Sequence, residues 1–201
     1  MQTFTIPSAD GKNTLACYRT DCREPRLMLQ ISHGMCEYFL RYEGFAEFLA
    51  GRGILVFGHD HLGHGRTAKT PEELGFFAEK NGWDFAVRDV YALTEHMKSE
   101  YPGVPVVLMG HSMGSFIVRN YMFRYGTGVS AAIIMGTGMQ PQTRLTMARI
   151  LGSIQKVLFG PEYVSKLMDK MAFGKYNDRI ENCKTDTDWL SRDPERVDRY
   201  R

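Results

Sequence analysis

The sequence predicts an α/β protein with a mostly parallel sheet and helices on both faces. Along residues 1–138, apolar runs alternate with helical patterns, which is the order that builds such a sheet. The apolar runs are nearly continuous, as strands that are buried on both faces require. The chain has 201 residues, of which 43% are hydrophobic and 24% charged. This is an ordinary globular composition, with enough length to bury a sizeable core.

The predicted elements follow one another in a regular order. Residues 3–7 and 15–19 form two short strands around the turn signal Asp10-Gly11. Further strands are predicted over 27–31, 54–57, 104–109 and 131–135, and helices over 39–52, 83–100 and 113–125. The helical segments carry apolar residues three and four positions apart, so each can cover a face of the sheet.

The character of the sequence changes after Gly138. Two amphipathic helices are expected, around residues 147–158 and 164–171, with Phe159-Gly160-Pro161 between them. The stretch from residue 177 onward is polar and charged and shows no strand pattern. We therefore expect a sheet core over 1–138 and a helical appendage over 139–201.

The motif with the clearest chemistry is Gly110-His111-Ser112-Met113-Gly114. The pattern G-x-S-x-G places a serine on a tight strand-to-helix elbow, and here it stands between a predicted strand and a predicted helix. The positive end of the helix dipole would favour an oxyanion beside Ser112. Ser112 is therefore the candidate nucleophile, and the alternative is a glycine-rich turn with an incidental serine.

A second motif, His33-Gly34-Met35-Cys36-Glu37-Tyr38, follows the predicted strand 27–31. A hydrolase with this kind of elbow takes its second oxyanion donor from the loop after that strand. The donors would then be the backbone N–H groups of Met35 and Met113, for which the identity of the side chain does not matter. The alternative is a simple turn between a strand and a helix.

The third motif is Asp60-His61-Leu62-Gly63-His64-Gly65-Arg66-Thr67. Its histidines do not have the helical His-x-x-x-His spacing, and no cysteine or glutamate stands at ligand spacing, so we expect no metal. The structural interpretation is a tight loop held by Asp60 and the imidazoles. No dinucleotide fingerprint and no phosphate loop is visible, and no cofactor is expected.

Together these segments resemble the monoacylglycerol lipase and lysophospholipase branch of the α/β-hydrolases, which is grouped with serine aminopeptidase-like hydrolases. The matching stretches are HGMCEYFLRYEGFAEFLAGRGI, DHLGHGRT, GWDFAVRDV and GHSMGSFIVRNY, and the resemblance extends through WLSRDPERVDRY. It implies the α/β-hydrolase fold, Ser112 as nucleophile, Met35 and Met113 as oxyanion donors, and a helical cap or lid over 139–201. The residues expected to support the site structurally are His33, Gly34, Glu37, Asp60, Gly63, His64, Gly65, Gly110, His111 and Gly114.

The acidic residue and the histidine that would complete a catalytic triad with Ser112 are absent from these candidate residues. In this architecture the chain order is Ser, then Asp or Glu, then His. All six histidines nevertheless precede Ser112, at positions His33, His59, His61, His64, His96 and His111. A serine hydroxyl is a weak nucleophile until a base takes its proton. The resemblance places both residues on strands after the cap, so the chain looks C-terminally truncated and is expected to be inactive alone.

The resemblance implies a serine ester hydrolase that acts on monoacylglycerols, lysophospholipids or similar single-chain carboxylic esters through an acyl-enzyme at Ser112. A small lipid-like ester would then be its partner. Two alternatives stay open. One is a catalytically incompetent fragment or pseudo-hydrolase with a binding role, which the missing histidine favours, and the other is a small-peptide aminopeptidase. Acyl chain length, head group and oligomeric state are not encoded.

Charge and targeting patterns restrict the expected partners and the expected cellular compartment. The net charge is +2 and no basic run is present, so no nucleic-acid partner is expected. The N-terminus does not read as a signal peptide, and no apolar run approaches the roughly 18 residues of a membrane span. The four cysteines contain no Cys-x-x-Cys pair, which favours a reducing cytoplasm. Transient contact of the cap with a membrane surface is the only membrane interaction expected.

Overall fold

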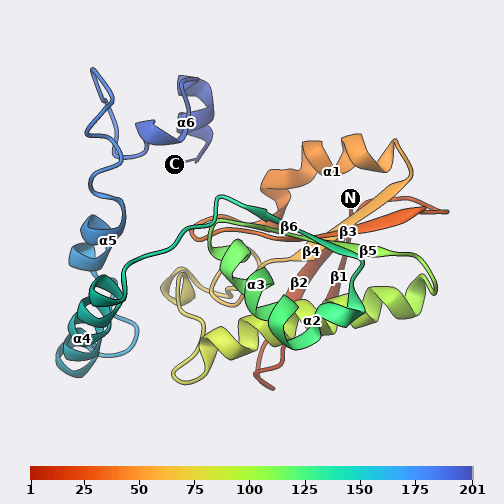
Figure 1. Ribbon diagram of the computed structural model, residues 1–201, viewed down its shortest axis with the longest axis horizontal. Helices are drawn as coiled ribbons and strands as arrows, with labels where there is room; N and C mark the ends of the chain where they lie inside the picture. Colours follow the sequence, from red (N-terminus) through yellow and green to blue (C-terminus); the bar gives the residue numbers. More distant parts are fainter. Residues whose placement is uncertain (201) are drawn as a thin grey trace. The chain divides into compact units, whose positions relative to one another are not determined.

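The computed structural model describes residues 1–200, and the chain separates into two compact units. The first unit is Met1–Met139 and holds the sheet, whereas the second is Gln140–Arg201, whose described residues form helices and loops. Figure 1 shows the elements of both units.

The first unit contains a six-stranded sheet in the order β1-β2-β4-β3-β5-β6. The strands are β1 Gln2–Pro7, β2 Thr14–Arg19, β3 Leu27–Ser32, β4 Ile54–His59, β5 Val106–His111 and β6 Ala131–Met135. β1 and β2 join the sheet antiparallel, and β4, β3, β5 and β6 pair in parallel. The predicted mostly parallel sheet is therefore confirmed. β5 begins two residues later than predicted, because Pro105 lacks an N–H and precedes the strand.

Helices cover both faces of this sheet (Figure 1). The 3-10 turn η1 Phe39–Tyr42 and helix α1 Glu43–Ala50 lie on one face, and α2 Gly82–Glu100 and α3 Met113–Tyr125 lie on the other. Two further 3-10 turns are η2 Pro71–Glu73 and η3 Gly126–Gly128. The single helix predicted over 39–52 is divided, because Tyr42 has a ψ of 3° and leaves the α-helical region.

Successive strand residues point to opposite faces and fill two separate layers of core. On the α1 face, Ile31 and Val56 pack with Phe39 and Ala46. On the opposite face, Leu108 of β5 packs in one cluster with these buried residues of α2 and α3: Ala86, Val87, Val90, Ile117, Val118 and Tyr121. Full burial of one such aliphatic or aromatic side chain contributes about 1.5–3 kcal/mol. These two layers hold the central strands rigidly.

The carboxyl ends of three parallel strands meet at one edge of the sheet. β3 ends at Ser32, β4 at His59 and β5 at His111, and the register pairs Ser32 with Gly110. In open α/β sheets, ligands bind outside the carboxyl ends of the strands. The three loops whose sequences indicate chemistry follow these three strand ends.

The second unit consists of α4 Gln142–Phe159, α5 Lys166–Phe173, the 3-10 turn η4 Asp188–Leu190 and α6 Pro194–Tyr200. Ser165 caps α5, because its hydroxyl accepts the Met168 N–H at 3.1 Å. Trp189 contacts the rings of Phe173 and Tyr176. Among residues 1–200, no helix combines the length and the apolar character that crossing a bilayer requires.

Candidate active site

Ser112 lies at the sharp junction between β5 and α3. Its backbone has φ 51° and ψ −117°, outside the regions that residues other than glycine normally occupy. The Ser112 N–H donates to Met135 O at 3.0 Å, and the Ser112 carbonyl accepts the Ser115 N–H at 2.9 Å. A strained serine held from both sides is typical of a functional elbow.

The elbow glycines are needed because the backbones around them are too close for a side chain. A Cβ at Gly110 would lie 2.7 Å from Val118 Cγ2, and one at Gly114 would lie 2.6 Å from His33 O and closer still to Ser32 O. Gly114 therefore lets the first turn of α3 pack directly against the end of β3. This contact sets the distance between Ser112 and the loop that follows β3.

The loop after β3 packs directly against Ser112. A Cβ at Gly34 would lie 3.2 Å from Ser112 Cβ and 2.7 Å from Glu37 Oε1. Met35 is the next residue, and its backbone N–H donates to no protein acceptor within residues 1–200; nor does that of Met113. These two N–H groups are the donors that the sequence predicts for an oxyanion, and neither is used by another acceptor among the described residues.

The Glu37 carboxylate is largely buried, and several polar groups around this loop form hydrogen bonds or ion pairs with it. It accepts the Gly34 N–H and the Tyr42 hydroxyl, the latter at 2.8 Å, and Arg41 Nε lies 3.5 Å from its second oxygen. From the elbow, His111 Nδ1 lies 3.2 Å from Glu37 Oε1. Burial alone would raise the pKa of Glu37, but hydrogen bonds from His111, Gly34 and Tyr42 outweigh it and lower that pKa. The hydrogen bond to Glu37 raises the pKa of His111.

His33, His59, His61 and His64 form a buried cluster beneath the loops. The His33 and His61 ring centroids are 4.3 Å apart, and those of His59 and His61 are 4.8 Å apart. His33 Nε2 accepts the His61 N–H at 3.0 Å, so its Nδ1 carries the proton and donates to Gly34 O at 2.7 Å. This pattern requires a neutral ring. Burial lowers the pKa of His33 to about 4 and that of His59 to about 3.

Asp60 holds the loop after β4 to two other elements. Its carboxylate accepts the Phe39 N–H at 2.8 Å, the Tyr18 hydroxyl at 2.7 Å and the Arg66 N–H at 2.8 Å. A Cβ at Gly65 would lie 2.9 Å from Asp60 Oδ1. Gly63, with φ 68°, is pressed against the Phe76 backbone. His64 Nδ1 donates to Leu62 O at 2.9 Å and completes the turn.

The structure thus gathers the residues predicted for the nucleophile, the oxyanion hole and their support at one edge of the sheet. Sequence reasoning did not assign Tyr18, whose hydroxyl donates to Asp60. Tyr18 gave no local signal, because its partner is 42 positions away. In residues 1–200, no group of three or more His, Cys, Asp or Glu side chains is arranged to hold a metal ion.

A mostly parallel sheet, a strained serine between β5 and α3, and a glycine loop packed against that serine define the α/β-hydrolase class. The family model for serine aminopeptidase, S33 (Hydrolase_4) matches residues 23–201. The chain therefore belongs to this family.

Individual relatives agree with this assignment. The chain is 33% identical over 192 residues to the monoglyceride lipase homolog of Monkeypox virus, covering 92% of this chain and 67% of that protein. It is 38% identical over 112 residues to human monoglyceride lipase, covering 56% of this chain and 35% of the human protein. A thermostable carboxyl esterase from Bacillus coagulans, solved with glycerol, superposes with a TM-score of 0.88 at 30% identity and covers 99% of this chain and 64% of the esterase. The chain thus spans about two thirds of these proteins or less.

Proposed function

We propose that Ser112 is the nucleophile of a serine ester hydrolase that cleaves monoacylglycerols or similar single-chain carboxylic esters. The observation that carries the proposal is the strained Ser112 backbone with the Gly34-Met35 peptide packed against it. Monoglyceride lipases and a carboxyl esterase among the relatives support the same reaction class.

In the proposed reaction, Ser112 Oγ attacks the ester carbonyl carbon and the carbonyl electrons move onto its oxygen. The N–H groups of Met35 and Met113 then donate to this oxyanion. Collapse of the intermediate expels the alcohol and leaves an acyl-enzyme, which water hydrolyses. The Ser112 proton needs a base. No histidine follows Ser112 in the printed sequence, so the proposal leaves that base unassigned.

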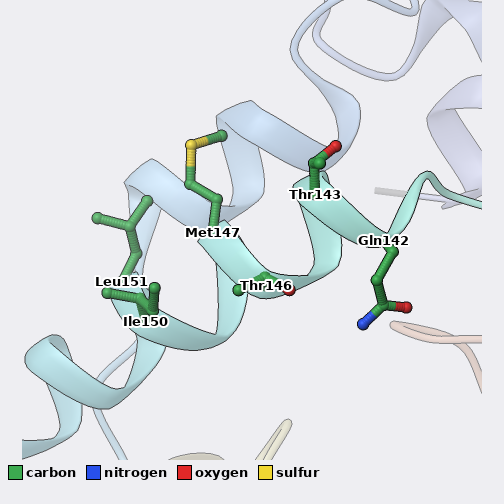
Figure 2. Close-up of a pocket in the computed structure, with 6 residues that line it drawn as sticks. All are labelled: Gln142, Thr143, Thr146, Met147, Ile150 and Leu151. Atoms are coloured by element: carbon green, nitrogen blue, oxygen red, sulfur yellow. The ribbon is translucent and has the colours of Figure 1, made fainter.

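The second unit supports a lipid-like substrate. One side of α4 carries a shallow depression of about 440 Å³, lined by Gln142, Thr143, Thr146, Met147, Ile150 and Leu151. In Figure 2, Met147, Ile150 and Leu151 project from neighbouring turns of α4. Ile150 and Met147 are about half exposed. We propose that this surface, as part of a cap, takes up an acyl chain and touches a lipid surface transiently.

We further propose a reducing compartment, the cytoplasm, as the location. Within residues 1–200, none of the four cysteines forms a disulfide, which supports this placement.

Covalent labelling tests the nucleophile. We expect an alkyl fluorophosphonate to modify the chain at Ser112, and Ser112→Ala to abolish the adduct, because phosphonylation depends on the oxygen and on the oxyanion donors that surround it. Intact-mass and peptide mass spectrometry measure the adduct, and Ser130→Ala, at an exposed serine, is the matched control. Equal labelling of Ser112→Ala would refute the assignment.

The substrate class is tested with the same chemistry. Phosphonylation by a reagent with a long alkyl chain should be faster than by a short one, and Ile150→Gln should reduce that difference. Arg149→Gln, also on the exposed surface of α4, serves as the control. Equal rates for both chain lengths would leave an ester hydrolase without the lipid preference.

A further inference from the structure

The Glu37 carboxylate connects the two segments that supply the proposed oxyanion donors. It accepts the Gly34 N–H, one residue before Met35, and lies 3.2 Å from Nδ1 of His111, one residue before Ser112. Tyr42 bridges the same pair, with its hydroxyl 2.8 Å from Glu37 Oε1 and 3.1 Å from His111 Nδ1. The residues 37 and 111 are 74 positions apart, so this contact is a tertiary tie between loop and elbow.

We propose that Glu37, through His111, is a positioning residue that holds the Met35 N–H at a fixed distance from Ser112. The inference rests on the proposed function, because it assigns Met35 a role in stabilising the oxyanion. Gly34 is confined between Glu37 and Ser112, since a Cβ at position 34 would lie 2.7 Å from Glu37 Oε1 and 3.2 Å from Ser112 Cβ. A shift of Glu37 therefore moves the peptide that carries the donor.

Charge explains why a carboxylate can stand here. An unpaired anion beside a developing oxyanion would oppose the reaction. Glu37 is instead paired with His111 on the elbow side and with Arg41 Nε at 3.5 Å on the loop side. Hydrogen bonds to a charged group are stronger and shorter than neutral ones, so the carboxylate holds the loop more firmly than an amide would.

The test uses the full chain with Glu37→Gln and His111→Gln, with Glu47→Gln on the exposed side of α1 as the control. We expect Glu37→Gln to slow Ser112 phosphonylation about tenfold or more, since small displacements of positioned groups cost up to about a hundredfold. Hydrogen exchange of the Gly34 amide should become faster, and the pKa of His111, followed by NMR, should fall. Glu47→Gln should change none of these quantities.

A double-mutant cycle separates the tie from general structural damage. If both residues act through one contact, Glu37→Gln and the double variant should slow labelling by the same factor. If the double variant instead slows labelling by the product of the two single-variant factors, the proposal is overturned. Should Ser112→Ala be labelled as fast as the unaltered chain, the proposed function fails, but Gly34 exchange and His111 titration still decide whether the Glu37–His111 contact holds the loop. Both quantities unchanged in Glu37→Gln would overturn the proposal. His111→Gln, at a partly exposed residue, repeats the exchange measurement if Glu37→Gln does not fold.

Discussion

Replacing Gly114 by alanine is expected to lower the free energy of unfolding by about 3 kcal/mol or more. The added Cβ would lie 2.6 Å from His33 O and closer still to Ser32 O. Both atoms belong to the backbone at the end of β3, which is buried and paired with β4 and β5. The clash can be relieved only if α3 moves away from the sheet, and that movement opens the core around Ile117 and Val118.

Gly44→Ala is the matched control for this substitution. Gly44 lies in α1 of the same unit, and a Cβ there would meet no atom within 4 Å. Alanine favours the helix by up to about 1 kcal/mol over glycine, so this variant should be as stable as the unaltered chain or slightly more stable. Urea unfolding followed by circular dichroism gives both midpoints. A Gly114→Ala midpoint equal to that of Gly44→Ala would contradict the close packing at the elbow.

The parallel core could be predicted because its strands are short apolar runs with glycine or polar residues at their ends. The strand order could not, since it depends on pairings between distant segments. Nothing local to β2 indicates that it pairs antiparallel with β4 through Tyr18 and Gly58. The helix over 39–52 was predicted too long, because periodicity does not distinguish a 3-10 turn from the first turn of an α-helix.

The second unit shows the same difference between local and non-local signals. The period of apolar residues located α4 and α5, but α6 Pro194–Tyr200 was missed because its sequence is polar. Its start did carry a signal: Asp193 accepts the Glu195 N–H at 3.0 Å, and Pro194 occupies the first helical position.

Local sequence patterns predicted which residues belong to the candidate site, but not the contacts between them. The strand–G-x-S-x-G–helix order indicated the elbow, and the backbone of Ser112 has the strained geometry that such an elbow requires. Glu37 and His111 were both expected to support the site, yet their contact could not be foreseen, because it joins residues 74 positions apart. The burial of four histidines together also depends on two segments far apart in the sequence, the loop after β3 and the end of β4 with its following loop.

Acidification from pH 7 to pH 5 is expected to lower the free energy of unfolding by about 2–3 kcal/mol or more. An unfolded histidine has a pKa near 6.5, whereas burial lowers the pKa of folded His33 to about 4 and that of His59 to about 3. Below pH 6.5 the unfolded chain therefore binds protons that the folded chain does not, so stability falls as the pH falls. Each of these two histidines contributes about 2 kcal/mol by pH 5.

Asp89 acts in the opposite direction and limits this loss. Burial raises its pKa to about 6, although the Ala9 N–H donates to it at 2.6 Å and the Ser8 hydroxyl at 3.0 Å. The folded state then binds a proton that the unfolded state does not between about pH 6 and pH 4, which restores about 1.4 kcal/mol by pH 5. His61 and His64, whose pKa values burial also lowers, add to the loss. The raised pKa of His111 acts in the same direction as that of Asp89, and the four buried histidines outweigh both.

His59→Phe isolates one member of the cluster. Within residues 1–200, neither ring nitrogen of His59 has a hydrogen-bond partner, so phenylalanine removes the titration without breaking a bond. We expect this variant to lose about 2 kcal/mol less than the unaltered chain between pH 7 and pH 5. His96→Gln, at a partly exposed histidine outside the cluster, is the control. Urea midpoints at the two pH values measure both effects, and equal midpoints for the unaltered chain would show that the cluster is not held neutral by burial.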